Sequence, residues 1–283
     1  MHVGGEGSVL VLLHGICGTW EIWKPVLPAL EARHQVIAMT LPGHYGGAAY
    51  VGPGDATVAG VADQIVASLR SLGIESAHVA GNSFGGWLAI ELARRRFARS
   101  VVAFSPAGGW SSDHDYRAIA RSFSILYSSI DLLRLLSSPI IRYARVRKLL
   151  ARQTMEHGDR VPEPAFRAFL TAMSNCEILP GLLRTMGRDG PIAAFEASMP
   201  IRIAWCDRDR VIPFSRYGES FVKRVRGAEL TMVHGAGHVP LYDDPEQIVE
   251  KIVDVTSSVD SASVSYKPLQ IATRYQSPPR LCP

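Results

Sequence analysis

The chain has 283 residues and a mass of 30.8 kDa, is 47% hydrophobic and 20% charged, and has a mean hydropathy of +0.09. This composition is typical of a soluble globular protein near the size at which single cores stop growing, so one domain with an inserted subdomain is expected. The formal net charge is only +4, and the basic residues are scattered, which argues against a nucleic-acid partner.

The four cysteines stand at positions 17, 176, 206 and 282, without any C-x-x-C spacing. Neither a zinc site nor a dense disulfide framework fits this spacing, so free thiols in a reducing compartment are expected. The amino terminus has no basic segment followed by a long apolar one, and no apolar stretch approaches the roughly 20 residues of a membrane helix. The sequence therefore predicts a cytoplasmic protein without an integral membrane segment.

Short apolar runs recur along the chain, each followed by residues that break a strand. Continuous apolar runs of this kind are typical of strands buried on both faces of a parallel sheet. The predicted strands are Val9–Leu13, Gln35–Met39, Ala77–Ala80, Val101–Phe104, Ile201–Cys206 and Glu229–Val233.

Helical patterns lie between most of these strands. In Val58–Leu72 the apolar residues recur at helical spacing, with Thr57 as the N-cap and Gly73 as the stop. Strands that alternate with helices predict an α/β fold with a doubly wound, mostly parallel sheet.

The alternation is interrupted once. Residues 1–105 and 200–256 carry the strand and helix pattern, whereas residues 106–199 show helical spacing, many arginines and almost no strand pattern, and are predicted to form an inserted helical cap. Residues 257–283 are rich in Ser and Pro and are expected to be a poorly ordered tail outside the catalytic unit.

The segment Gly81-Asn82-Ser83-Phe84-Gly85 stands between a predicted strand and a predicted helix, Gly86–Arg96. This is the context of a nucleophile elbow, a tight turn that holds its serine at a strained backbone angle between two glycines. The turn also places Ser83 at a helix N-terminus, where the helix dipole favours developing negative charge. Ser83 is therefore the candidate nucleophile.

His14-Gly15 ends the first predicted strand. The loop after it can turn the backbone N–H of Ile16 toward Ser83, and this group together with the N–H of Phe84 would form an oxyanion hole. A His-Gly dipeptide alone carries little weight, since most such histidines only satisfy a loop hydrogen bond.

Two later loops supply a candidate acid and a candidate base. The loop after Ile201–Cys206 contains Asp207 and Asp209, and either carboxylate can reach the carboxyl edge of the sheet or pair with a neighbouring arginine. The loop after Glu229–Val233 contains His238 among small residues, whereas His234 continues the strand.

With these motifs the sequence resembles the α/β-hydrolase superfamily, in its branch of small serine esterases, perhydrolases and carbon-carbon bond hydrolases. The resemblance covers roughly residues 3–255, and the order Ser83, Asp209, His238 matches the superfamily order of nucleophile, acid and base. It implies Asp209 as the acid, because members usually have D-x-x-x-P in that loop and Asp209 to Pro213 has this spacing. Cys206, where relatives commonly have glycine, departs from the pattern.

The resemblance implies a serine hydrolase that cleaves a carboxylic ester or related acyl bond of a small, largely apolar substrate through an acyl-enzyme on Ser83. It implies no metal and no cofactor, and it leaves the oligomeric state open. Enzymes of the superfamily that open epoxides or remove halogens use a carboxylate at the nucleophile position, so Ser83 disfavours both activities. Two alternatives share the motifs: a meta-cleavage carbon-carbon hydrolase, and a ligand receptor that keeps an intact triad and turns its ligand over slowly.

The insertion carries two further patterns. One is a set of apolar residues, part of which is a candidate lining of an acyl pocket above Ser83. Packing between helices is the commoner role of such residues. The set is Phe123, Ile125, Leu126, Tyr127, Ile130, Leu132, Leu133, Leu135 and Leu136. Basic residues form a stripe that can steer an anionic substrate, touch an acidic surface or be solvated: Arg142, Arg145, Arg147, Lys148 and Arg152.

The front of the chain is short for this superfamily, because it begins only eight residues before the first clear strand. One or both of the edge strands expected there are predicted to be missing. Two explanations are open: a start codon placed too late, or a strand of the tail, Leu269–Ala272, that covers the exposed edge.

Overall fold

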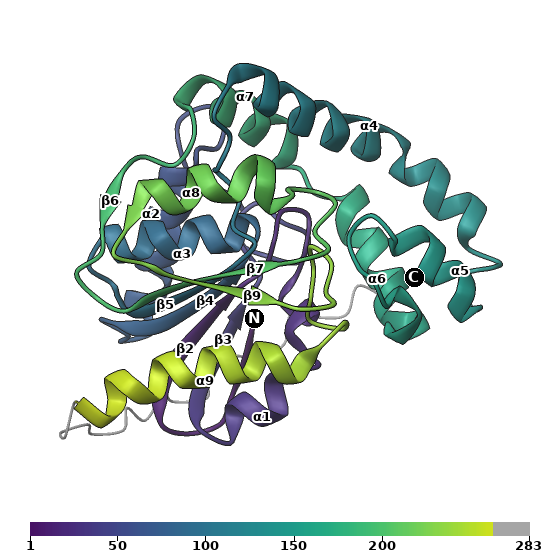
Figure 1. Ribbon diagram of the computed structural model, residues 1–283. Coiled ribbons are helices and arrows are strands. Elements are labelled where there is room, and N and C mark those ends of the chain that lie inside the picture. The colour runs from purple at the N-terminus through teal and green to yellow at the C-terminus, as the bar shows by residue number, and fades with distance from the viewer. Residues whose placement is uncertain (263–283) are drawn as a thin grey trace.

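A doubly wound sheet forms the centre of the protein, as the sequence predicts (Figure 1). The computed structural model describes residues 1–262. The strands are β1 (His2–Gly4), β2 (Ser8–Leu13), β3 (His34–Met39), β4 (Ala77–Asn82), β5 (Ala98–Phe104), β6 (Phe195–Glu196), β7 (Ile201–Cys206), β8 (Val225–Arg226) and β9 (Glu229–Val233). The sheet has the order β1-β3-β2-β4-β5-β7-β9, and every neighbouring pair is parallel except β1 with β3.

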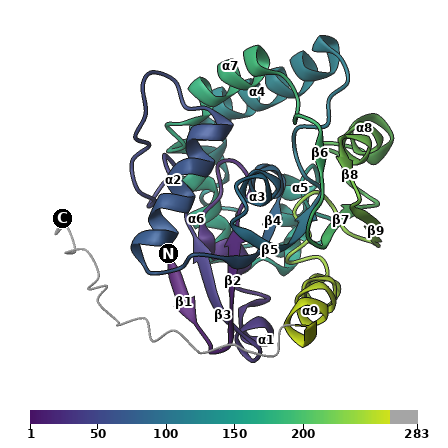
Figure 2. The same ribbon diagram turned by 90° about the vertical axis from the view of Figure 1, so that its left-hand side faces the viewer.

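The helices cover both faces of this sheet (Figure 2). The α-helices are α1 (Leu27–Glu31), α2 (Val58–Ser71), α3 (Phe84–Arg94), α4 (Asp113–Ser137), α5 (Ala144–Ala151), α6 (Glu163–Ser174), α7 (Leu179–Asp189), α8 (Glu219–Arg224) and α9 (Pro245–Ala262). Two 3-10 turns, η1 (Trp20–Trp23) and η2 (Gly158–Arg160), and a π-helical turn, η3 (Phe214–Gly218), complete the described part of the chain.

Strand β2 shows why apolar runs form this sheet. All of its residues are buried, and successive side chains point to opposite faces. Val11 packs in the same core as Ile65 of α2, whereas Leu12 packs in the core that contains Ile252 of α9. A strand with helices on both sides must be apolar at every position, which produces the continuous runs in the sequence.

Helix α2 begins where the sequence predicts and ends one residue before the predicted Leu72, at Ser71. The Thr57 hydroxyl accepts a hydrogen bond from the backbone N–H of Gly60 at 3.0 Å and so caps the first turn. Gly73 follows the helix with a φ of +80°, a left-handed conformation that stops the helix and favours glycine.

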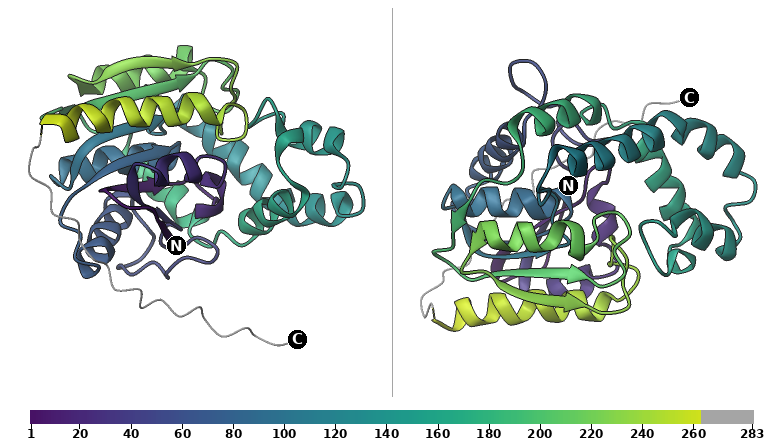
Figure 3. Two further views of the ribbon diagram at one scale, coloured as in Figure 1. Left: turned by 90° about the horizontal axis from the view of Figure 1, so that it is seen from below. Right: turned by 45° about the horizontal axis from the view of Figure 1, so that its top comes forward.

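Helices α4 to α7 occupy the stretch between β5 and β7, where the sequence predicts a helical insertion. Seen with the top of the molecule turned forward, the end of α4 extends with α5 and α6 to one side of the sheet (Figure 3). Part of this insertion has its own apolar cluster, built around Ile130, Ile141, Phe166 and Leu170. The pair β6 and β8, which joins the end of the insertion to the segment after α8, is a feature that the sequence pattern did not predict.

Both ends of the described chain add contacts that the sequence pattern missed. Strand β1 pairs antiparallel with β3, so one edge strand is present before β2. The tail predicted to begin at residue 257 is wrong for its first residues, because α9 continues to Ala262. There Asp260 accepts hydrogen bonds from Ser8 and Arg99. The proposed tail strand Leu269–Ala272 lies outside the described residues.

Candidate active site

Ser83 lies in the turn between β4 and α3 with a φ of +56° and a ψ of −116°. This conformation is rare for a residue with a side chain and marks a strained turn. A Cβ at Gly81 would lie 2.1 Å from the backbone oxygen of Gly85, and a Cβ at Gly85 would lie 2.1 Å from that of Leu13. Both positions therefore require glycine, which explains the spacing of glycines around the serine.

Three buried side chains from three different loops meet at this turn. The Oγ of Ser83 lies 2.8 Å from Nε2 of His238, and Nδ1 of His238 lies 2.7 Å from Oδ2 of Asp209. Because a carboxylate only accepts hydrogen bonds, the proton of a neutral His238 is on Nδ1, which leaves Nε2 free to accept from the serine hydroxyl. The structure thus brings together all three residues that the sequence proposes as nucleophile, acid and base.

Asp209, rather than Asp207, faces the histidine. Its second carboxylate oxygen, Oδ1, accepts hydrogen bonds from the backbone N–H groups of Val211 at 2.9 Å and Ile212 at 2.8 Å. Burial alone would raise the pKa of this carboxyl, but the facing His238 ring and the two N–H donors hold it below its usual value. Asp209 is therefore ionised at neutral pH.

Asp207 has a different set of partners. It accepts the N–H of Gly235 at 2.8 Å, and its Oδ2 lies 3.3 Å from the ring of His234, which is exposed to solvent. This pair lies outside the hydrogen-bonded chain that ends at Ser83. The neighbouring Cys206, where the sequence departs from its relatives, is buried, and burial raises the pKa of its thiol.

The loop after β2 lies beside the serine. Ile16 and Phe84, the two expected oxyanion donors, line the same pocket as Ser83. The loop is held by His14, whose Nε2 accepts the N–H of Leu41 at 2.9 Å and whose Nδ1 lies 2.6 Å from the carbonyl of Gly15. His14 thus carries its proton on Nδ1, and complete burial together with the nearby His44 keeps its pKa well below the usual range.

Asn82 is a site residue whose contacts the sequence did not reveal. Its Nδ2 donates to the backbone carbonyl of His238 at 2.8 Å and to that of Phe104 at 3.2 Å. The residue before the serine therefore fixes the loop that carries the histidine. The only signal in the sequence was its place within the elbow motif.

Asp243 is a second residue that sequence reasoning missed. Its buried carboxylate accepts backbone N–H groups from Gly237 at 2.8 Å, Glu156 at 3.0 Å and His157 at 2.6 Å. The first belongs to the loop of His238 and the other two to the insertion. One side chain thus ties the insertion to the histidine loop.

An apolar pocket opens at Ser83. It is lined by Ile16, Ser83, Phe84, Ala107, Gly108, Gly109, Trp110, Tyr116, Ile119, Phe123, Leu183, Met186, Val211, Ile212 and Tyr217. Most of these side chains are apolar, so the pocket favours the apolar part of a ligand. Helices α4 and α7 of the insertion form one wall of the pocket.

The α4 residues that the sequence offers for an acyl pocket have different environments. Phe123 lines the pocket, and Ile130 is buried inside the insertion. Leu132, Leu135 and Leu136, by contrast, are exposed. The helical period identifies which residues share a face, but it does not determine which face meets the sheet.

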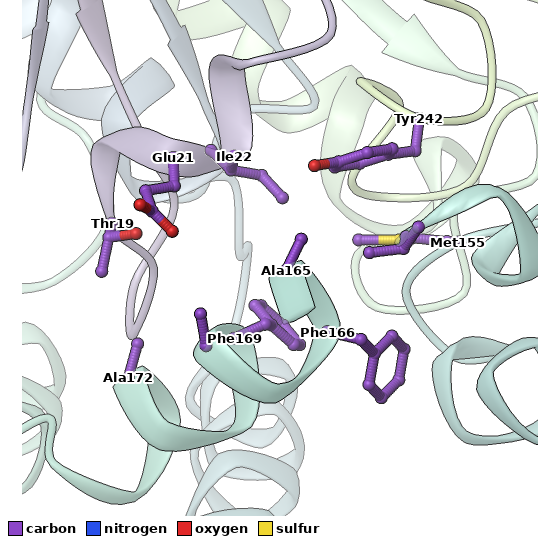
Figure 4. A pocket seen from close by; sticks show the side chains of 11 residues that line it. Thr19, Glu21, Ile22, Met155, Ala165, Phe166, Phe169, Ala172 and Tyr242 are labelled. Carbon is purple, nitrogen blue, oxygen red and sulfur yellow. The ribbon is translucent and has the colours of Figure 1, made fainter. Parts of the chain in front are cut away.

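A second pocket lies between η1, α6 and the loop after His238 (Figure 4). Ile22, Phe169 and Tyr242 contribute to its walls, and Glu21 at its edge is paired with Lys24 at 3.0 Å. None of Ser83, Asp209 and His238 is among its lining residues. The candidate chemistry therefore belongs to the pocket at Ser83.

Within residues 1–262 no group of three or more His, Cys, Asp or Glu side chains has an arrangement that could hold a metal ion. In the same part of the chain no helix combines the length and the apolar character needed to cross a bilayer.

Comparison with known proteins identifies the family. A model of the alpha/beta hydrolase family matches residues 10–251, and the chain belongs to this family. An epoxide hydrolase of Mycobacterium tuberculosis, EphH, is 32% identical over 196 residues, which are 68% of this chain and 91% of that protein. A putative carbamate hydrolase, RutD of Variovorax paradoxus, is 24% identical over 93% of this chain and 97% of its own length.

A solved structure shares the architecture. The thermophilic esterase of Thermogutta terrifontis superposes with a TM-score of 0.71 at 17% identity and covers 91% of this chain and 92% of its own. At this identity the likeness establishes the fold alone. The protein is therefore a hydrolase of the alpha/beta hydrolase family with a doubly wound sheet, as the sequence predicts.

Proposed function

We propose that this hydrolase cleaves carboxylic esters, or related acyl bonds, of small and largely apolar molecules through an acyl-enzyme on Ser83. The observation that carries the proposal is the hydrogen-bonded chain from Asp209 through His238 to Ser83, which lines an apolar pocket. A serine hydroxyl in this position is activated when the imidazole takes its proton.

The reaction follows from the positions of these groups. His238 accepts the Ser83 proton at Nε2 as Oγ attacks the carbonyl carbon, and Asp209 stabilises the resulting imidazolium. The negative oxygen of the tetrahedral intermediate accepts hydrogen bonds from the backbone N–H groups of Ile16 and Phe84. Each of these bonds stabilises the transition state by about 3 kcal/mol. His238 then protonates the leaving alcohol, and water hydrolyses the acyl-enzyme by the reverse sequence of steps.

The similarity to an epoxide hydrolase does not transfer that activity to this chain. A carboxylate that opens an epoxide forms an ester, which water can cleave at its carbonyl carbon. If the Ser83 hydroxyl opened an epoxide, the product would be an alkyl ether without a carbonyl, and the enzyme would remain alkylated. The side chain at position 83 therefore favours acyl transfer.

The insertion, residues 106–199, supplies the substrate-facing wall in this proposal. Phe123 of α4 and Leu183 and Met186 of α7 line the pocket together with Ser83. The walls exclude water from the acyl group and so strengthen the oxyanion contacts. We infer that the insertion acts as a cap that selects the acyl chain.

Steady-state turnover of p-nitrophenyl esters of increasing acyl length tests the proposal, with styrene oxide as the competing substrate. We expect many turnovers per enzyme on the esters and none on the epoxide. Ser83→Ala is expected to lower kcat by about 10⁴ or more, and to abolish labelling by a fluorophosphonate, without lowering the melting temperature.

Three results would contradict the proposal. A single stoichiometric burst of p-nitrophenol would indicate a ligand receptor, and turnover of vinylogous diketone acids in preference to every ester would indicate a carbon-carbon hydrolase. Epoxide opening that survives Ser83→Ala would place the chemistry elsewhere.

A further inference from the structure

The far end of the insertion carries large apolar side chains that nothing covers within the described residues. Leu135 and Leu136 near the end of α4 are 72% and 64% exposed, and Leu149 of α5 is 62% exposed. Ile140 and Tyr143, in the connection between the two helices, are also exposed. A contiguous exposed patch of large apolar side chains is unusual at a solvated helix end and is typical of an interaction surface.

The apolar residues of α4 follow a helical stripe. Ile125, Leu132 and Leu136 are separated by seven and four positions and therefore share one face of the helix. All three are exposed, whereas Ile130, on another face, is buried in the insertion. The helix thus has a second apolar face that does not belong to the protein core.

The same segment concentrates positive charge. Residues 131–152 contain six basic residues and one acidic residue, Asp131, which gives a net charge of +5 where the whole chain has +4. Arg147 is buried and donates to backbone carbonyls, but Arg142, Arg145, Lys148 and Arg152 are exposed. Lys148 lies 3.8 Å from Asp159, the one carboxylate within 4 Å of these four cations in the described chain.

We name this surface the insert tip and define it by Leu132, Leu135, Leu136, Ile140, Tyr143 and Leu149 together with Arg142, Arg145, Lys148 and Arg152. In Figures 1 and 3 the end of α4 and helix α5 extend from the body of the molecule on the side away from α2 and α3. A surface that projects in this way can meet a flat partner without a clash from the rest of the chain.

We propose that the insert tip docks on the surface of an anionic lipid bilayer. Leucine and tyrosine side chains bind at the boundary of headgroups and acyl chains, and exposed lysine and arginine side chains are attracted to anionic headgroups. The tip combines both features on adjoining helical segments. This inference concerns binding and does not depend on ester cleavage at Ser83.

The charge makes a second copy of the chain a poorer partner. A two-fold dimer would place the tip against itself, so that Arg142, Arg145 and Lys148 would face their own copies. Like charges brought together in this way oppose association, whereas anionic headgroups neutralise them. The lipid surface is therefore the partner that matches both the apolar and the basic residues.

The connection to the site runs along α4. The first half of this helix contributes Ile119 and Phe123 to the pocket at Ser83, and its last turns carry the exposed leucines. A docked tip would hold the pocket wall near the layer in which apolar esters dissolve.

Sedimentation of the full-length protein with vesicles tests the proposal. The vesicles are phosphatidylcholine alone or with about 30% phosphatidylglycerol. We expect binding to the anionic vesicles that weakens as salt rises from about 50 to about 500 mM, and much weaker binding to the neutral ones. Arg142→Gln with Arg145→Gln is expected to weaken the anionic binding by about 30-fold, and Leu135→Ser with Leu136→Ser by about tenfold or more.

A matched control removes the same charge elsewhere. Lys223→Gln with Arg226→Gln changes two exposed basic residues of α8 and β8, and it is expected to leave vesicle binding unchanged apart from a small general charge effect. The melting temperature and the turnover of a water-soluble ester should be the same in all three double variants, which separates a docking defect from unfolding or a damaged site.

Three outcomes would overturn the proposal. The first is wild-type protein that does not bind anionic vesicles, and the second is a control variant that loses as much binding as the tip variants. The third is wild-type protein that does not bind vesicles but forms a concentration-dependent dimer, which Leu135→Ser with Leu136→Ser converts to monomer. That last result would make the tip an interface between copies of this chain.

Discussion

The side-chain amide of Asn82 donates to the backbone carbonyl of His238 at 2.8 Å, so the residue that precedes the serine also holds the loop that carries the histidine. The distance between Ser83 and His238 therefore depends on a contact made by the neighbour of the nucleophile. A second bond from the same amide to Phe104 anchors it to the adjacent strand.

Asn82→Ala is expected to lower kcat by about 10- to 100-fold with little change in KM, because the histidine loop loses its anchor while the pocket keeps its walls. Kinetics on one p-nitrophenyl ester measure both constants. Asn175→Ala, at the exposed end of α6, is the control and should leave both unchanged. A rise in KM alone would instead give Asn82 a role in substrate binding.

Asp209→Asn is expected to reduce kcat by about 10⁴, because an amide can donate to Nδ1 and leave the proton of His238 on the wrong nitrogen. Asp207→Asn removes at most an exposed pair worth about 0 to 1 kcal/mol and keeps an oxygen that accepts the N–H of Gly235. Turnover of the two variants, compared at one pH, checks the assignment. Equal losses of kcat in the two variants would contradict the assignment of Asp209 alone as the acid.

A chain that ends at Ser258 is expected to melt about 5 to 10 °C below one that ends at Ala262. The shorter chain lacks Asp260, which accepts hydrogen bonds from Ser8 at 2.6 Å and Arg99 at 2.8 Å and lies 3.1 Å from Nε2 of the fully buried His78. Removing the partner of the buried His78 Nε2 costs about 1 to 3 kcal/mol, and the bonds to Ser8 and Arg99 are lost with it. Asp260→Asn in the full-length chain should give a smaller loss in the same direction, and identical melting curves would contradict the role of Asp260.

His78 is expected to lower the free energy of unfolding by up to about 3 kcal/mol as the pH drops from 6.5 to 4. Burial lowers the pKa of His78 to about 4, despite the opposing contact with Asp260, whereas the unfolded chain binds this proton near pH 6.5. The unfolded state then holds more protons than the native state across this window, so stability rises with pH.

Denaturant unfolding at several pH values measures this slope. His78→Gln should remove its share of this slope, while the lowered pKa values of His14 and His34 leave a dependence in the same direction. A slope that is unchanged in the variant would assign the acid sensitivity to other groups.

The local features of the protein could be read from its sequence. Continuous apolar runs such as Val9–Leu13 identify strands buried on both faces, and the glycines around Ser83 identify a turn that excludes side chains. Both signals depend on the backbone and its nearest neighbours. The sheet and the serine at its edge followed from them.

The tertiary structure decided everything that depends on contacts between distant segments. The contact of Asp209 with His238, the bond from Asn82 to His238 and the bridge from Asp243 to the insertion join residues far apart in the chain. The same is true of Asp260, which the polar composition of residues 257–262 had assigned to a tail. Periodicity reports which residues share a face of a helix or strand, but the partner of that face is set by how the elements pack, as the buried Ile130 and the exposed Leu135 of one helix demonstrate.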